Sequence, residues 1–217
     1  MIDDDDVEQV VHAGKTLAPA ASAYLEDDFV MNILETVLDY MLKTTVVVKA
    51  LEYFRANRWD EVRTLDALEA VLVRYPDDQH GNTTLAVYLW GYKLWTRAQQ
   101  LRGLASYFRN IGVVDRETLK AWAHRSEFRR DFEGRVKGLG PAVYQWLVMR
   151  QGVDTVKPDV HVRKFAEAAV GRPLSDADVI EVVTRAAGAL GIKAYELDWR
   201  IWEASQGGGL AYPAGPA

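Results

Sequence analysis

The chain has 217 residues, of which 49% are hydrophobic and 11% aromatic, and its formal net charge is −5. This composition supports a sizeable folded core and is not that of a disordered chain. The absence of cysteine excludes disulfides, cysteine-rich zinc sites and iron–sulfur clusters. No apolar run has the length of a membrane span, and the acidic start does not resemble a signal peptide. We therefore expect a cytoplasmic protein without a membrane partner.

The charged residues are unevenly distributed along the chain. Residues 1–92 hold 7 Lys and Arg against 17 Asp and Glu, whereas residues 93–150 hold 12 against 5. A local basic patch, rather than a basic net charge, is what contact with phosphates requires. A solvated basic surface explains the same excess equally well, so charge alone does not decide between the two.

Apolar residues at helical spacing predict an all-α fold, with no convincing strand and no internal repeat. Asp60, Asp115 and Ser175 are predicted helix N-caps. A break is expected near Lys43, before a run of β-branched residues, and Gly91 would divide one long run into two helices. We expect two helical lobes with a cleft between them. The predicted parts are an N-terminal arm over 1–28, a helical domain over 29–206 and a flexible tail over 207–217, with helices at about 29–55, 60–74, 84–110, 115–123, 126–135, 142–149, 159–171, 175–189 and 194–206.

Two motifs between residues 136 and 164 carry the chemistry. The first, Gly138-Leu139-Gly140, precedes an apolar helical run, and such glycines leave amide N–H groups exposed at a positive helix end. That geometry suits a phosphate. The second motif, Lys157-Pro158-Asp159-Val160-His161, places a carboxylate at the start of another helix about twenty residues later.

Together the two motifs resemble the helix-hairpin-helix, Gly/Pro-rich-loop, Asp superfamily of DNA glycosylases, which includes endonuclease III and the adenine and alkylpurine glycosylases. Both halves occur at the family's spacing, which makes the match more specific than a Gly-x-Gly alone. The chain departs from the family in having Lys137 where Pro is usual and Lys164 where Arg is usual. The matching residues are Val136, Gly138, Leu139 and Gly140 in a hairpin over 126–151, and Asp159, His161, Val162 and Lys164 after it.

The resemblance implies a base-excision repair enzyme, acting as a monomer on double-stranded DNA that contains a damaged or modified base. Asp159 is the expected catalytic residue, because a carboxylate stabilises the positive charge that develops on the sugar as the glycosidic bond breaks. The structural alternative is an ordinary N-cap aspartate beside Pro158. The expected DNA contacts are Lys137, Gly138, Leu139, Gly140, His161 and Lys164.

Ala142 stands where bifunctional members of that superfamily carry a nucleophilic lysine. The resemblance therefore implies a monofunctional glycosylase in which water attacks the sugar of a flipped nucleotide. No cofactor is expected, although backbone carbonyls of the Gly138–Gly140 turn could hold a sodium or potassium ion. The candidate base-pocket residues are Tyr40, Trp95 and Tyr144, although most aromatic side chains in such runs pack in the protein core.

Two other interpretations stay open. A non-catalytic helix-hairpin-helix DNA-binding protein is favoured by the acidic net charge and by the unusual Lys137-Gly138 turn. A helical protein–protein interaction module would require the spacing of the two motifs to be accidental. The sequence does not name the base, although the many aromatic residues and the missing lysine lean toward alkylated purines.

Overall fold

The computed structural model describes residues 1–20 and 25–206, and every regular element in this part of the chain is a helix. The predicted all-α class is therefore confirmed. The flexible tail predicted over 207–217 lies outside the described residues. Among the helices that are described, none is long and apolar enough to cross a membrane.

The chain divides into two compact units, one formed by Glu26–Gln151 and the other by Met1–Leu25 together with Gly152–Ala217. The sequence predicted a different division, with residues 1–28 set apart as an arm. Helix α1 (Asp4–Gly14) shows why the division differs. It packs against α9 (Val160–Val170) and α10 (Asp176–Leu190), so the N-terminal residues belong to the same unit as the C-terminal helices.

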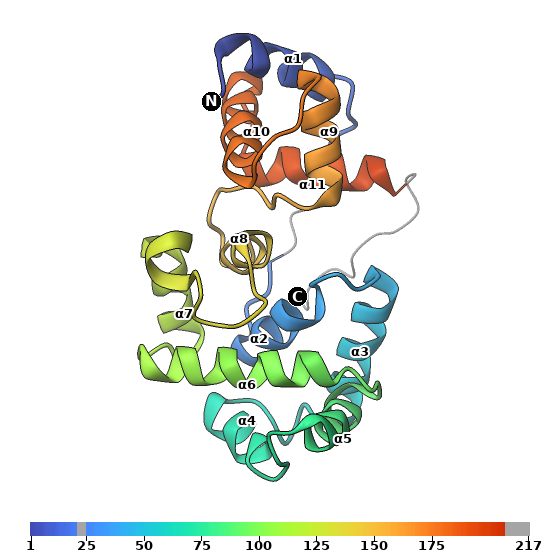
Figure 1. Ribbon diagram of the computed structural model, residues 1–217, viewed down its shortest axis with the longest axis vertical. Helices are drawn as coiled ribbons and strands as arrows, with labels where there is room; N and C mark the ends of the chain where they lie inside the picture. The colour runs from blue at the N-terminus through green and yellow to red at the C-terminus, as the bar shows by residue number, and fades with distance from the viewer. Residues whose placement is uncertain (21–24, 207–217) are drawn as a thin grey trace. The chain divides into compact units, whose positions relative to one another are not determined.

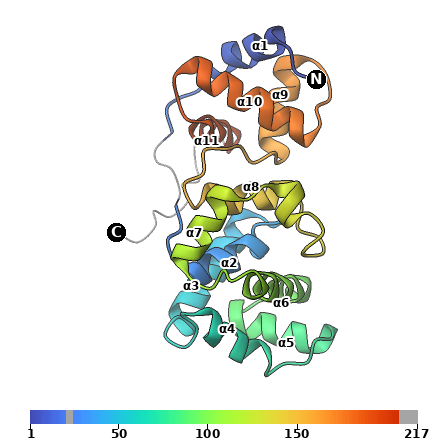
Figure 2. The same cartoon turned by 90° about the vertical axis from the view of Figure 1, so that its left-hand side faces the viewer.

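Helix α2 (Phe29–Leu38) is the central element of the unit formed by Glu26–Gln151. All ten of its residues are buried, including the polar Asn32, Glu35 and Thr36, which contact the buried Arg150 side chain. It lies between α6 and α8 in both cartoon views (Figures 1 and 2). It also contacts α3 and α4, and α5 packs against α3 and α6. The remaining helices of this unit are α3 (Thr44–Asn57), α4 (Leu65–Leu72), α5 (Gln79–Trp90), α6 (Trp95–Asn110), α7 (Arg116–Arg125) and α8 (Pro141–Met149).

The predicted breaks near Lys43 and Gly91 are confirmed. Lys43 precedes α3, and Gly91 ends α5 in the left-handed conformation (φ 74°) that a glycine adopts without strain. The start predicted at Asp60 is wrong. The N-cap of α4 is Thr64, whose side chain accepts a hydrogen bond from the Ala67 amide, so the helix begins four residues later than predicted.

The first helix predicted for the hairpin, over 126–135, is also wrong in length. Only one wide helical turn, η1 (Phe128–Phe132), forms there. The Asp131 carboxylate accepts a hydrogen bond from the Glu127 amide at the start of this turn, and Gly134 has a positive φ of 72° just after it. The chain therefore reaches the glycine turn through a compact loop, and a helix-hairpin-helix with two full helices stays a prediction.

The other unit encloses an apolar core between α1, α9, α10 and α11 (Ala194–Ser205). The predicted cap of α10 is confirmed, because Ser175 and Asp178 form a reciprocal capping box. Gly191 ends that helix with a positive φ of 73°. The core residues include Val162, Ala166, Val179, Val183, Ala186, Leu197 and Ile201.

Candidate functional site

Asp159 is the N-cap of α9. Its Oδ1 accepts hydrogen bonds from the backbone amides of His161 (2.8 Å) and Val162 (3.1 Å). Its Oδ2 lies 3.8 Å from the Lys157 ammonium, and its side chain is 18% exposed. The carboxylate is thus fixed in direction by two backbone amides, while part of it stays accessible to a ligand.

A second carboxylate, Asp198 on α11, lies beside this cap. Its Oδ2 accepts a hydrogen bond of 2.7 Å from the Lys157 amide, which ties α11 to the segment before α9. Burial, together with the negative charge of Asp159, raises the pKa of Asp198 to about 8. Asp198 is therefore protonated at neutral pH, and the pair consists of one neutral acid and an N-cap carboxylate.

The same unit contains a cap of nearly identical chemistry. Asp154 Oδ1 accepts hydrogen bonds from the amides of Ala194 and Tyr195 at the start of α11, and its Oδ2 lies 3.9 Å from the Lys193 ammonium. Asp154 is more exposed than Asp159, at 40% against 18%. The feature that sets Asp159 apart is its buried neighbour Asp198.

The glycine turn before α8 leaves several amides without an acceptor. Gly138 has a positive φ of 84°, and Gly140 is the N-cap of α8 with no side-chain cap. Within the described residues the amides of Gly138, Gly140 and Ala142 donate no hydrogen bond. Free amides at a helix start favour an anion, and a phosphate at this turn stays a prediction.

Leu139, one of the predicted DNA contacts, is 4% exposed, and its amide donates to the Val136 carbonyl. Its side chain anchors the turn to the core, and contact of this turn with DNA stays a prediction. The predicted contacts Lys137 and Lys164 are exposed, and His161 is half-buried. The structure gives the side chains of these three residues no hydrogen bond or ion pair to other described residues.

The loop between α2 and α3 presents Tyr40 and Met41. Tyr40 is half-buried, and Arg97 from the first turn of α6 donates to its carbonyl and lies 5.1 Å from the centre of its ring. Met41 is 82% exposed and has a positive φ of 56°, the one non-glycine residue of the described chain with this conformation. Arg97 thus fixes a strained loop whose tip is an apolar side chain.

The three predicted base-pocket residues have different environments. Trp95 begins α6 and is half-buried, like Tyr40. Tyr144 is 3% exposed, and its hydroxyl is hydrogen-bonded to Ser126 at 2.9 Å. Its ring packs against Trp122, Phe128 and Phe132. Tyr144 therefore belongs to the core, and its ring faces are taken by other aromatic side chains.

The structure brings Asp159, Lys157 and Asp198 together in one unit, with His161 and Lys164 on the same helix as the Asp159 cap. The glycine turn, Tyr40 and Trp95 belong to the other unit. A common cleft for the two groups stays a prediction. Among the described residues no cluster of three metal-binding side chains is present.

Sequence reasoning missed Asp198 and Arg97 as site residues, and it did not foresee the backbone conformation of Met41. Asp198 stands between apolar residues in a helix, and an acid at such a position is the signal that could have drawn attention to it. Arg97 and Met41 gain their importance from long-range contacts and backbone conformation, which the local sequence does not display.

A comparison with protein families matches residues 94–206 to one described as Domain of unknown function (DUF8548). The chain belongs to this family. The matched segment contains the glycine turn, Asp159 and Asp198, so all the candidate chemistry except the Tyr40 loop lies within it. No match was found in the comparisons with curated proteins and with solved structures.

Proposed function

We propose that this protein is a monofunctional DNA glycosylase, which removes a damaged or modified base from double-stranded DNA inside the cell. The observation that carries the proposal is the fixed, partly exposed Asp159 carboxylate, which lies beside the buried carboxyl of Asp198. A carboxylate held in this way at the start of α9 can stabilise the positive charge that develops on the sugar.

The reaction assigned to this site is hydrolysis of the N-glycosidic bond. The bond between C1′ and the base nitrogen breaks, and the base leaves with the bonding electron pair. Asp159 stabilises the positive charge on the sugar and orients a water molecule, whose oxygen bonds to C1′. One proton of that water is transferred, directly or through Asp159, to the departing base. Asp198, being protonated and buried, adds no second negative charge to the resting site.

The glycine turn supports the DNA part of the proposal. Its free amides at Gly138, Gly140 and Ala142 can hold a backbone phosphate without reading the base. Ala142 carries no amine, so water is the nucleophile. Carbonyls of the same turn are the proposed ligands of a sodium or potassium ion.

Met41 supports contact with a duplex. Exposed apolar side chains such as methionine are inserted between base steps by proteins that kink or open DNA. The strained, Arg97-fixed loop presents Met41 as such a wedge, and the neighbouring Tyr40 and Trp95 are the remaining candidates for the base pocket.

The second candidate function is a DNA-binding protein without catalysis. One observation favours it: the Asp159 carboxylate is already used in capping α9, much as the Asp154 carboxylate accepts hydrogen bonds from the first amides of α11. A screen separates the two functions. Duplexes with alkylated, deaminated or oxidised bases are incubated with the protein and then treated with heat and alkali, which cut at abasic sites. Cleavage at one lesion supports the glycosylase, whereas lesion binding without cleavage supports the second candidate.

A further inference from the structure

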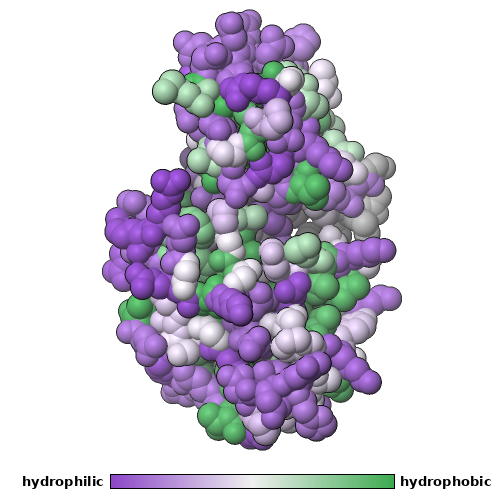
Figure 3. Space-filling model, in the orientation of Figure 1, coloured by the Kyte–Doolittle hydropathy of each residue, from purple (hydrophilic) through white to green (hydrophobic). Residues whose placement is uncertain are grey.

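A pocket of about 700 Å³ lies at the ends of α6 and α7, beside η1. Its volume is in the range of sites that bind small organic molecules. Hydrophilic side chains gather over α7 on the face seen in Figure 3. The pocket is lined by Tyr107, Asn110, Ile111, Trp122, Arg125, Ser126, Arg130, Asp131 and Arg135. These residues all belong to the unit formed by Glu26–Gln151, and none of them has a role in the proposed excision chemistry.

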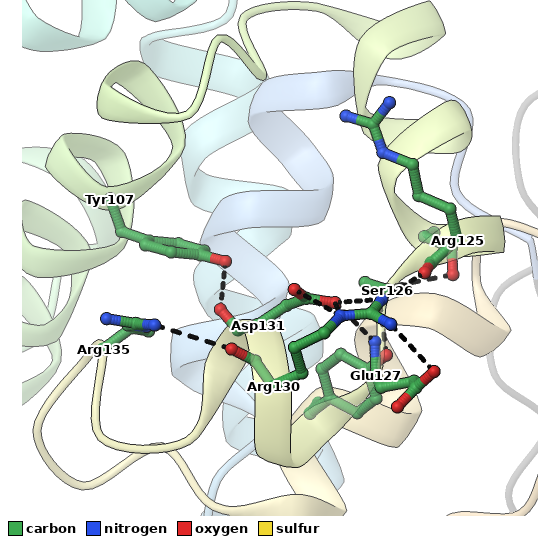
Figure 4. A network of polar contacts seen from close by, with 9 residues as sticks. Tyr107, Arg125, Ser126, Glu127, Arg130, Asp131 and Arg135 are labelled. Carbon is green, nitrogen blue, oxygen red and sulfur yellow. Dashed lines mark hydrogen bonds and ion pairs between the residues drawn. The ribbon is translucent and has the colours of Figure 1, made fainter.

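The three arginines of the pocket differ in how they are engaged. Arg130 forms hydrogen-bonded ion pairs with Asp131 (2.7 Å) and Glu127 (2.9 Å), and it also donates to the Arg125 carbonyl. The Arg125 side chain points away from this network, and the Arg135 guanidinium lies beside Tyr107 (Figure 4). Arg125 makes no side-chain hydrogen bond or ion pair to other described residues, and Arg135 makes one long contact of 3.5 Å to the Arg130 carbonyl.

The consequence is an excess of positive charge at the pocket wall. Asp131 is occupied by Arg130, so the charge of Arg135 stays available to a ligand. Guanidinium groups bind oxyanions such as phosphate through paired hydrogen bonds. Mutual packing also fixes the pocket wall, because the Tyr107 hydroxyl donates to the Asp131 carbonyl and its ring meets Trp122 edge to face at 6.3 Å.

A phosphate alone would leave most of this volume empty. The rest of the lining includes the half-buried Tyr107 ring and the Ile111 side chain, which is 40% exposed. The exposed Asn110 amide, which has no hydrogen-bond partner among the described residues, can pair with the edge of a heteroaromatic ring. A phosphate-binding arginine beside an aromatic and an amide side chain matches the parts of a nucleotide.

We propose that this pocket binds one nucleotide unit, with its phosphate held by Arg135 and its base placed against Tyr107 and Ile111. The nucleotide is either a free nucleoside monophosphate or an unpaired nucleotide of a strand, since both present the same groups. The inference does not depend on the proposed glycosylase activity. The Asp159→Asn change lies in the other unit and is expected to leave nucleotide binding unchanged.

Calorimetric titration tests the proposal with four probes: deoxyadenosine monophosphate, deoxyadenosine, inorganic phosphate and a single-stranded oligonucleotide. We expect the monophosphate or the oligonucleotide to bind at least about tenfold more tightly than nucleoside or phosphate alone. Tight binding of the monophosphate identifies a free nucleotide as the ligand, and binding of the oligonucleotide alone identifies a strand.

The variant Arg135→Ala is expected to weaken this binding at least about tenfold. Its side chain is exposed and lacks a strong partner, so the fold should persist, which circular dichroism checks. Arg129→Ala is the matched control, because Arg129 is an exposed arginine of η1 that does not line the pocket. Absence of binding by both the monophosphate and the oligonucleotide, or an equal loss in the Arg129 variant, would overturn the proposal.

Discussion

The backbone amide of Lys157 donates a 2.7 Å hydrogen bond to the buried carboxyl of Asp198. Lys157 stands two residues before Asp159, the N-cap of α9. This bond ties α11 to the turn that carries the proposed catalytic carboxylate. It also places two acids close enough for the charge of Asp159 to contribute to the raised pKa of Asp198.

Asp198 makes stability depend on pH in a defined window. Its folded pKa of about 8 lies above the value of about 4 in an unfolded chain, so the folded state holds a proton that the unfolded state releases. The contribution of the protonated Asp198 to the free energy of unfolding is complete below pH ~4. It is lost as the pH rises to ~8, by at most about 1.4 kcal/mol per pH unit. The Asp198→Asn variant keeps an acceptor for Lys157 and should gain stability relative to wild type across this window. Urea unfolding at pH 5 to 8 measures the difference, and a difference that does not change with pH would contradict the assignment.

A buried ion pair supports the other unit. The Arg150 guanidinium lies 3.2 Å from the Glu35 carboxylate, both side chains are fully buried, and Arg150 also donates to Asn32 and Thr36. We expect Arg150→Met to lower the free energy of unfolding by about 3–5 kcal/mol, because it leaves Glu35 charged and buried. Adding Glu35→Leu should restore much of that loss, and a double-mutant cycle by urea unfolding measures both effects.

The control for this cycle is the exposed pair of Arg116 and Asp27, whose N–O distance is 3.0 Å. Arg116→Ala should change the free energy of unfolding by less than about 1 kcal/mol. A similar small effect of Arg150→Met would show that the buried pair does not hold α8 against α2.

The two glycines of the turn should respond differently to alanine. Gly138 has a positive φ, and an added Cβ would lie 2.8 Å from Gln100 Nε2, whereas Gly140 has a negative φ and open space around it. Gly138→Ala should therefore lower stability by about 1–2 kcal/mol and Gly140→Ala by little. Thermal unfolding checks the stability. If a phosphate sits on this turn, both variants bind undamaged duplex more weakly, and a Gly140 variant with wild-type affinity would remove the turn from the DNA contacts.

The absence of a lysine at position 142 makes a prediction about the nucleophile. The wild-type protein should release a base without cutting the strand, and borohydride should trap no covalent complex with DNA. Lys157, whose ammonium lies 3.8 Å from Asp159, is the substitute to test. Efficient trapping that disappears in Lys157→Ala would make Lys157 the nucleophile and the enzyme bifunctional.

Much of the fold could be predicted where a local signal decides the structure. The capping box of Asp115 with Thr118, the glycine stop at Gly91 and the cap at Asp159 all act within a few residues, and all three are present. The start of α4 was missed because two cap residues compete locally. Thr64 binds the Ala67 amide, whereas the Asp60 side chain is 95% exposed and pairs with Arg63.

The site could be predicted only in part, for the same physical reason. Asp159 and the glycine turn belong to short motifs, so the sequence displays them. The burial of Tyr144, the raised pKa of Asp198 and the pairing of Arg150 with Glu35 depend on side chains brought together from distant parts of the chain. No periodicity or motif reports such contacts.

The most direct test of the central claim compares two aspartates of the same unit. Asp159 and Asp154 each cap a helix through Oδ1 and lie near a lysine ammonium, and asparagine preserves a cap at both positions. On a lesion that the wild-type protein excises, single-turnover base release should be abolished in Asp159→Asn and unchanged in Asp154→Asn, with DNA binding kept in both. Equal excision by the Asp159 variant and wild type would contradict the claim and leave Asp159 a helix cap.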